Sequence, residues 1–304
     1  MEPRIYAHCW TLLPVMNTVE AARFAADNGF QGLEVFCNPL EFWPGMIDAA
    51  TLAELAAIAR GEDLEFSLYG CSTVNAATGL AEIRSLNDDT MARMLDVCAK
   101  IGATVLCIHP GTIVEFGNLE RKGVPFHSER FDRDDLMREG RQRSVETITR
   151  WADLAAPVGV TIVVENDVHV RHTAAPTAES LAEIVTAVGR PNVKVNFDTG
   201  HAFIGAGLIE ELDVLKPLIG HFHLDDNSTP RASEHLPLGD GAVDFPSIAE
   251  CLATADAALA IEIYAPDRPV EATLASRDYI LGVIASARPP ATLRAWDRTI
   301  DSII

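Results

Sequence analysis

Short apolar runs alternate with amphipathic stretches along most of this chain. The apolar runs cover residues 5–10, 30–36, 64–69, 103–109, 160–165, 193–198, 219–224 and 259–264. The run at 193–198 alternates with the period of two that predicts a β-strand, and the run at 103–109 is continuously apolar, as in strands that a parallel sheet buries on both faces. The stretches between them carry apolar side chains at helical spacing. They cover residues 18–28, 52–60, 88–101, 134–156, 177–188, 208–215, 245–255 and 270–287.

Eight strand–helix repeats favour one (β/α)8 TIM barrel over residues 1–288. A doubly wound open sheet is the alternative, but it would carry a glycine-rich fingerprint after its first strand, where this chain has His8-Cys9-Trp10. Pro289-Pro290 then separates a short amphipathic tail, residues 289–304, which we expect to be helical and to pack on the barrel or on a partner subunit. Two long loops interrupt the pattern, 110–133 and 225–243, and a loop as long as the first is usually functional or disordered.

Charge and cysteine usage narrow the class of protein. The formal net charge of −20 repels phosphate backbones, so we expect no nucleic-acid partner. No apolar run approaches the thickness of a bilayer, and the first residues lack the layout of a signal peptide, so we expect no membrane partner either. The six cysteines are scattered without a C-x-x-C pair. Most lie in apolar contexts, which is typical of reduced core residues in a cytoplasmic protein.

Polar side chains end nearly every predicted strand: His8, Glu34, Tyr69, His109, Glu165, Asp198, His223 and Glu262. Because the carboxyl ends of barrel strands meet at one mouth, the last four of these side chains should converge. Carboxylates held together repel one another unless a cation lies between them. A shell of carboxylates and an imidazole suits Mn²⁺, Mg²⁺, Co²⁺ or Zn²⁺. The sequence therefore predicts a site for one divalent metal ion.

Five segments carry a family resemblance: VVEN (163–166), NFDTGHA (196–202), GHFHLDD (220–226), HLPLGDGAVDF (235–245) and IEIY (261–264). Together they resemble the xylose-isomerase-like TIM-barrel superfamily. That group includes sugar-phosphate isomerases and epimerases, ketose 3-epimerases, inosose dehydratases, hydroxypyruvate isomerases and the zinc apurinic-site endonucleases. The resemblance covers nearly the whole chain and is most specific from Glu165 onward. It implies one divalent metal, Mn²⁺ before the others, on Glu165, Asp198, His223 and Glu262, with the two glutamates as an acid/base pair and His201 in contact with substrate.

The resemblance implies an isomerase or epimerase that acts on a sugar, a sugar phosphate or a cyclitol ketone. A metal chelated by the carbonyl and an adjacent hydroxyl would stabilise an enediolate, while Glu165 and Glu262 move the proton on its two faces. A lyase or dehydratase, including one that eliminates from a keto-inositol or keto-glycoside, is the alternative, because elimination needs only a leaving group beside the same carbanion. A metal-free binding barrel is disfavoured, because such a protein would not need this set of metal-ligating side chains.

A zinc apurinic-site endonuclease is the third hypothesis. The segments FDTGHAF (197–203) and HPG (109–111) resemble its motifs, and His235 falls where that branch has a zinc histidine. Tyr69, however, replaces its strand-three histidine, and Ser233 replaces the aspartate two residues before its zinc histidine. Losing those ligands disfavours a three-zinc cluster, so we interpret His109 as a contact to a small substrate.

Other substrate contacts are predicted around the mouth: His8, Glu34, His235, Arg171 and Arg231. Arg171 stands between His169 and His172, and this basic trio would suit a phosphate or carboxylate, although a single arginine is by default a solvated loop charge.

Aromatic residues on loops expected at the mouth either wall an apolar or glycosidic substrate or only pack: Trp10, Phe36, Trp43 and Phe116. Family analogy suggests a homodimer or homotetramer.

Overall fold

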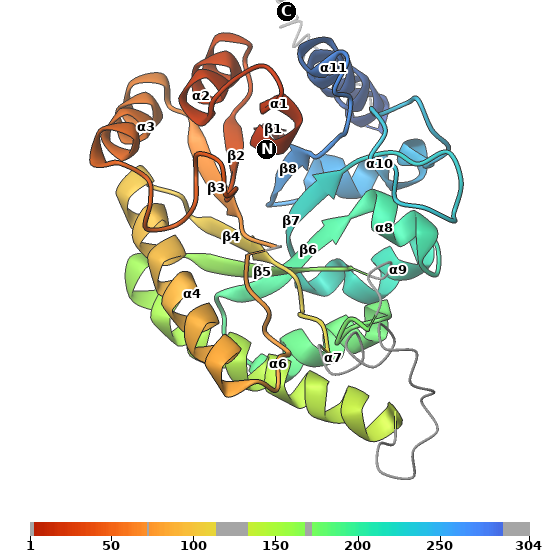
Figure 1. Ribbon diagram of the computed structural model, residues 1–304. Coiled ribbons are helices and arrows are strands. Elements are labelled where there is room, and N and C mark those ends of the chain that lie inside the picture. Colours follow the sequence, from red (N-terminus) through yellow and green to blue (C-terminus); the bar gives the residue numbers. More distant parts are fainter. Residues whose placement is uncertain (1–2, 72, 114–132, 168–171, 288–304) are drawn as a thin grey trace, which may run out of the picture.

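The computed structural model describes residues 3–71, 73–113, 133–167 and 172–287. Its strands pair in chain order, each parallel to the next, and β8 pairs with β1 to close a barrel (Figure 1). The strands are β1 (Arg4–His8), β2 (Gly32–Phe36), β3 (Glu65–Tyr69), β4 (Val105–Ile108), β5 (Thr161–Glu165), β6 (Val193–Asp198), β7 (Ile219–Leu224) and β8 (Ala258–Ile261). The predicted TIM barrel is confirmed.

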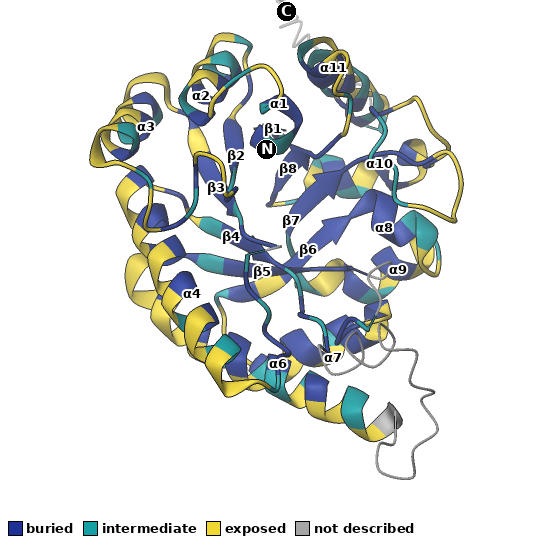
Figure 2. Cartoon of the chain, in the orientation of Figure 1, coloured by how far each residue is buried: buried dark blue, intermediate teal, exposed yellow. Residues whose placement is uncertain are grey.

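Helices follow the strands and surround the barrel (Figure 1). They are α1 (Cys9–Leu12), α2 (Thr18–Asp27), α3 (Ala49–Glu62), α4 (Ala81–Ile101), α6 (Arg133–Ala155), α7 (Ala178–Val188), α8 (Thr199–Ile204), α9 (Leu208–Leu215), α10 (Phe245–Thr254) and α11 (Pro269–Ala287), with short 3₁₀ turns at Ala156–Val158 and Lys216–Leu218. Figure 2 shows the outer faces of the helices exposed to solvent and the strands buried.

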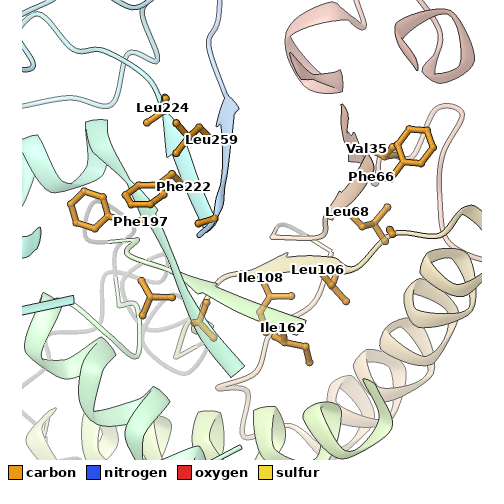
Figure 3. Close-up of a cluster of buried hydrophobic side chains, with 14 of the residues drawn as sticks. Val35, Phe66, Leu68, Leu106, Ile108, Ile162, Phe197, Phe222, Leu224 and Leu259 are labelled. Atoms are coloured by element: carbon orange, nitrogen blue, oxygen red, sulfur yellow. The ribbon is translucent and has the colours of Figure 1, made fainter. Parts of the chain in front are cut away.

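Alternate side chains of each strand point to opposite faces of the sheet. One set joins the helices in the main apolar core, and Figure 3 shows it: Val35, Phe66, Leu68, Leu106, Ile108, Ile162, Phe197, Phe222, Leu224 and Leu259. The alternation read from Val193, Val195 and Phe197 is confirmed, since all three are buried in this core.

The strand side chains on the opposite face, inside the barrel, are more polar than the stability of the fold requires. The buried ones include His8, Glu34, Ser67, Glu165, Asn196, Asp198, His221 and His223. Barrel interiors are usually filled by branched apolar side chains, and a buried polar group costs free energy unless it is paired. Such a concentration at the carboxyl end of the strands indicates a functional centre.

The largest differences from the sequence prediction are two short helices that were not predicted, α1 and α8, and the start of α4. The chain turns into α1 directly after His8, where the strand was predicted to continue to Trp10, because a four-residue helix is too short to leave a period in the sequence. Helix α8 begins at Thr199, where a loop was predicted, and the Asp198 carboxylate caps it by accepting a hydrogen bond from His201 N. Helix α4 starts at Ala81 rather than at residue 88.

Some predictions concern parts of the chain outside the described residues: the tail 289–304, Arg171 with His169, Phe116 and most of the loop 110–133. In the part that the structure describes, no helix is long and apolar enough to cross a membrane.

The cap of α7 gives a first testable prediction. Thr177 Oγ1 accepts a hydrogen bond from Ser180 N and the Ser180 hydroxyl accepts one from Thr177 N, a reciprocal capping box. We expect Thr177→Ala to lower the free energy of unfolding by about 1 kcal/mol in a urea titration. Thr186→Ala, on the exposed side of the same helix, is the matched control and should change it by less than about 0.5 kcal/mol. Equal effects of the two substitutions would contradict the cap.

Candidate active site

The four predicted metal ligands come together at the mouth of the barrel. Glu165 ends β5, Asp198 ends β6, His223 lies in β7, and Glu262 follows β8 directly. One donor atom from each lies within 4.8 Å of every other, and all four residues are buried. The His223 Nδ1 atom is 2.8 Å from Glu165 Oε1 and 2.8 Å from Glu262 Oε2. Three carboxylates and one imidazole therefore converge on one small volume.

The pKa values of the side chains in this cluster are set by burial and by the charges of their neighbours. Burial acts to raise the pKa of Glu165, but the His223 charge and hydrogen bonds outweigh it and hold that pKa well below its ordinary value. Burial acts to lower the pKa of His223, yet the Glu262, Glu34 and Glu165 charges hold it well above its ordinary value. Burial, with the charge of Glu165, raises the pKa of Asp198 to about 7. Protons thus compensate the carboxylates here, and a divalent cation would do so more effectively.

The donor atoms fit such a cation. Asp198 Oδ1 accepts a hydrogen bond of 2.6 Å from His201 N, whereas its Oδ2 atom is buried without a hydrogen-bond partner among the described residues. A buried carboxylate oxygen left this way costs free energy unless something else binds it. Carboxylate oxygens with one imidazole suit Mn²⁺, Mg²⁺, Co²⁺ or Zn²⁺ rather than a metal that requires thiolates.

Glu34 lies behind His223 rather than at the open mouth. Its Oε2 atom is 3.0 Å from His223 Nε2, and neither side chain has exposed surface. A carboxylate on the far nitrogen of a metal-binding imidazole fixes the ring orientation and the tautomer that binds. Glu34 was predicted to contact substrate, but this geometry suits a positioning role. His221, which the sequence prediction missed, lies next to it, with Nε2 at 3.9 Å from Glu34 Oε2.

His8 lies on the Glu262 side of the cluster. Its Nδ1 atom accepts a hydrogen bond from Trp10 N, so the ring carries its proton on Nε2, 3.9 Å from Glu262 Oε1. The ring packs edge-on against Tyr69, with 5.1 Å between the centroids. His8 is fully buried, and its Nε2 atom makes no hydrogen bond within the described residues.

His109 lies on the Glu165 side, between two carboxylates. Its Nε2 atom is 2.9 Å from Glu165 Oε2, and its Nδ1 atom is 3.1 Å from Asp167 Oδ2. Burial acts to lower the pKa of this imidazole, but the charges of Asp167 and Glu165 raise it to about 9. Its side chain is 20% exposed, so it reaches the mouth as predicted. Asp167 was missed, although the polar run Glu165-Asn166-Asp167 after a buried strand was visible in the sequence.

His201 and His235 line the same region from α8 and from the loop after β7. Their rings meet edge to face, with 5.6 Å between the centroids. His235 Nδ1 is 3.2 Å from Asp225 Oδ2, and Asp225 Oδ1 accepts a hydrogen bond of 2.7 Å from Gly200 N. Burial, with the charge of Asp198, holds the pKa of Asp225 well above its ordinary value.

The remaining predicted contacts are dispersed. Arg231 is exposed on the loop after β7, and the side chain of His172 is partly buried with a backbone φ of 61°. Trp10 stacks on Tyr264 with an interplanar angle of 20°, and Phe36 packs on Tyr69. Trp43 lines a surface cavity of about 370 Å³ together with Met46, Leu86 and Arg93.

Asp226 clamps the loop that carries His235. Its Oδ2 atom accepts hydrogen bonds from Gly239 N and Gly241 N, and its Oδ1 atom accepts one from Val243 N. We expect Asp226→Ala to lower the free energy of unfolding by about 2–4 kcal/mol, because backbone N–H groups lose their acceptor. Asp240→Ala, which removes only an exposed ion pair with Arg268, is the control and should cost less than about 1 kcal/mol in the same urea titration. A small effect of Asp226→Ala would show that water accepts the hydrogen bonds of these backbone N–H groups in place of the carboxylate.

Fold and cluster together define a class: a TIM barrel with donors for a divalent cation buried at its mouth. The chain belongs to the xylose isomerase-like TIM barrel family, whose model matches residues 22–281. The family resemblance indicated by the sequence motifs is therefore confirmed.

Three curated relatives illustrate the family. An uncharacterised protein of Methanocaldococcus jannaschii is 24% identical over 231 residues, which are 75% of this chain and 72% of the relative. The inosose isomerase of Bacillus velezensis is 36% identical over 111 residues, 36% of each chain. The probable endonuclease 4 of Mycobacterium leprae is 22% identical over 236 residues, 75% of this chain and 83% of the relative.

Solved structures share the fold over most of the chain. A D-tagatose 3-epimerase-like protein superposes with a TM-score of 0.75 at 21% identity and covers 94% of this chain and 99% of its own. The IOLI protein, solved with a zinc atom, superposes with a TM-score of 0.74 at 19% identity and covers 95% and 100%. A probable 3-DHS dehydratase from Bacillus anthracis superposes with a TM-score of 0.67 at 15% identity and covers 91% and 98%. The fold thus occurs in a protein named as epimerase-like, in a protein named as a probable dehydratase and in a protein solved with a zinc atom.

Proposed function

We propose that this protein is a divalent-metal-dependent isomerase or epimerase of a sugar, sugar phosphate or cyclitol ketone. The observation that carries the proposal is the cluster of Glu165, Asp198, His223 and Glu262, whose donor atoms lie within 4.8 Å of one another at the mouth. A solved structure named as D-tagatose 3-epimerase-like and a relative named as an inosose isomerase agree with this chemistry.

These four residues would hold the cation, Mn²⁺ before Mg²⁺, Co²⁺ or Zn²⁺. When bound, it would polarise a substrate carbonyl and stabilise the negative charge that develops once the neighbouring carbon loses its proton.

The two glutamates carry the proton transfer in this proposal. Both carboxylates lie 2.8 Å from His223 Nδ1, so a substrate at the mouth would meet a carboxylate from β5 and another from β8. One removes the α-proton, and the other returns a proton to the opposite face or to the adjacent carbon. His109 holds the Glu165 carboxylate, and His8 lies against Glu262, so each proton carrier has a neighbouring imidazole.

Elemental analysis and solvent exchange test the proposal. We expect about one divalent ion per chain in the purified protein. Incubation in D₂O with a panel of ketoses and keto-cyclitols should place deuterium next to the carbonyl of a substrate, detected by NMR. Exchange that persists unchanged after chelation and dialysis would contradict a metal-dependent mechanism. A protein that binds no metal on reconstitution and exchanges no member of the panel would remove the proposal.

A dehydratase is the second candidate, and one observation favours it. The His109 imidazole is held between Glu165 and Asp167, so it can present a proton beside the carboxylate that removes one. Such an acid would assist departure of a β-hydroxyl from the same carbanion. Loss of water from the substrate, rather than retention of mass with deuterium incorporation, distinguishes the two reactions.

An endonuclease has less support. The position of its strand-three histidine holds Tyr69, whose ring packs on His8 and His223. Cleavage of abasic DNA by protein carrying close to three zinc ions per chain would favour the nuclease over the isomerase.

We also propose a cytoplasmic location and a homodimer or homotetramer, in which residues 289–304 pack on the barrel or on a partner. Light scattering of the whole chain and of a chain ending at residue 288 tests the assembly.

A further inference from the structure

Two cysteine thiols lie against the candidate acid/base residue Glu165. Cys107 is in β4, and Cys71 follows β3 by two residues. Their Sγ atoms are 3.6 Å apart, and the Cys71 thiol donates a hydrogen bond of 3.2 Å to Glu165 Oε2. Both are buried at the mouth end of the barrel, next to Val163. The sequence prediction treated them as ordinary core cysteines, because 36 residues separate them in the chain.

The three donor atoms have the spacing of a cation site. Two thiolates on one tetrahedral Zn²⁺, with Zn–S of about 2.3 Å, lie roughly 3.8 Å apart. The Cys71 and Cys107 sulfurs are already at 3.6 Å, and an oxygen of Glu165 lies within 4.8 Å of both. A covalent S–S bond, at about 2.05 Å, would require the two sulfurs to move much closer.

The two oxygens of Glu165 face different neighbours. Oε1 faces His223 Nδ1 at 2.8 Å, on the side of the Asp198 and Glu262 cluster. Oε2 faces the Cys71 thiol at 3.2 Å and His109 at 2.9 Å. One carboxylate can therefore belong to two adjacent sites, one rich in oxygen and one rich in sulfur. Soft cations such as Cd²⁺ and Zn²⁺ prefer the thiolates, whereas Mg²⁺ and Mn²⁺ prefer the carboxylates.

We propose that Cys71, Cys107 and Glu165 form a second cation site, selective for soft divalent ions, that inhibits the enzyme by engaging the Oε2 atom of Glu165. The inhibitory part rests on the proposed function, since it assumes that Glu165 carries protons. The binding part stands on the geometry alone. His109, which lies 2.9 Å from Glu165 Oε2, is the partly exposed neighbour of this buried group, with 20% of its side chain exposed.

Cobalt spectroscopy tests binding without any activity measurement. The reduced, chelator-treated protein is titrated with Co²⁺, because thiolate ligands give an intense charge-transfer band in the near ultraviolet that oxygen and nitrogen ligands do not. We expect this band in the wild-type protein and in Asp198→Asn, which disrupts only the first site. Cys71→Ser and Cys107→Ser should each abolish it. Cys9→Ser is the matched control, since Cys9 is also buried but contacts Thr18.

The affinity for Cd²⁺ measures how much each cysteine contributes to the second cation site. Each site variant should bind Cd²⁺ more weakly by at least the roughly 10–100-fold that loss of an outer-shell partner costs. Cys107→Ala, which keeps a small apolar side chain beside Val163, serves as a second variant if the serine form does not fold. In the deuterium-exchange assay, Cd²⁺ should inhibit the wild-type protein at concentrations that leave both cysteine variants active.

The proposal is overturned if the reduced wild-type protein shows no thiolate–cobalt band, or if the band survives in both cysteine variants. A Cys71–Cys107 disulfide in protein kept under reductant would overturn it as well. A thiolate–cobalt band in a protein whose Glu165, Asp198, His223 and Glu262 cluster binds no metal, and which exchanges no member of the ketone panel, would refute the proposed function and leave the second cation site standing.

Discussion

Asp198→Asn should lose the metal ion and nearly all activity while the fold remains intact. Asparagine is almost isosteric with aspartate and caps helices equally well, so α8 keeps the hydrogen bond from His201 N. The cluster, however, loses the Asp198 carboxylate together with the negative charge of that carboxylate. We expect metal affinity to fall by more than about 100-fold and kcat/KM by about 10³-fold.

The same substitution should stabilise the metal-free protein. An aspartate whose pKa rises from 3.8 unfolded to about 7 folded is harder to ionise in the native state. Its contribution therefore opposes folding increasingly as the pH rises from about 4 to about 7, and asparagine has no such dependence. After chelation, the variant should melt at a higher temperature than the wild type at pH 8, and by a smaller margin at pH 5.

Calorimetry with and without metal measures both effects. Added Mn²⁺ should raise the melting temperature of the wild type and leave that of Asp198→Asn unchanged. Asp213→Asn on α9, an exposed aspartate outside the cluster, is the control and should behave as wild type. A variant that keeps its metal and activity would show that Asp198 only caps α8.

The strand pattern was sufficient to predict the barrel and the convergence of the four candidate metal ligands. Alternation at Val193, Val195 and Phe197 showed which face of β6 meets the helices, and barrel closure then brings the strand ends together. The spacing of residues along the chain could not show how deeply each side chain is buried in the barrel. Glu34 and His109 both end strands and both were predicted to contact substrate, yet Glu34 lies fully buried behind His223 while His109 reaches the mouth.

Contacts between residues far apart in the sequence also escaped prediction, because barrel closure and strand register decide which of them meet. The Cys71–Cys107 pair and the Glu34–His223 pair both arise this way, the latter across 189 residues. Helix α1 escaped for a different reason, since four residues span little more than one helical turn.

Replacing either glutamate by glutamine should lower kcat by about 10²–10⁴-fold. Glutamine preserves the size of the side chain, but it cannot accept the proton. Glu165 and Glu262 also serve as candidate metal ligands, so metal content must be measured in each variant and the assays run at saturating metal. Glu65→Gln, at the opposite end of the barrel where Glu65 pairs with Arg4, is the control and should retain wild-type activity.

Solvent exchange then separates the roles of the two glutamates. The residue that removes the α-proton is required for any deuterium to enter the substrate, so its glutamine variant should show neither exchange nor conversion. The residue that returns the proton is required only for the product, because the first carboxylate can return deuterium to the face it came from. Its variant should therefore exchange deuterium into the substrate without converting it. If both variants kept more than about a tenth of the wild-type kcat, neither glutamate would be a general base, since removing one costs at least about 10²-fold. The proton would then have to move through one of the neighbouring imidazoles, His109 beside Glu165 or His8 beside Glu262.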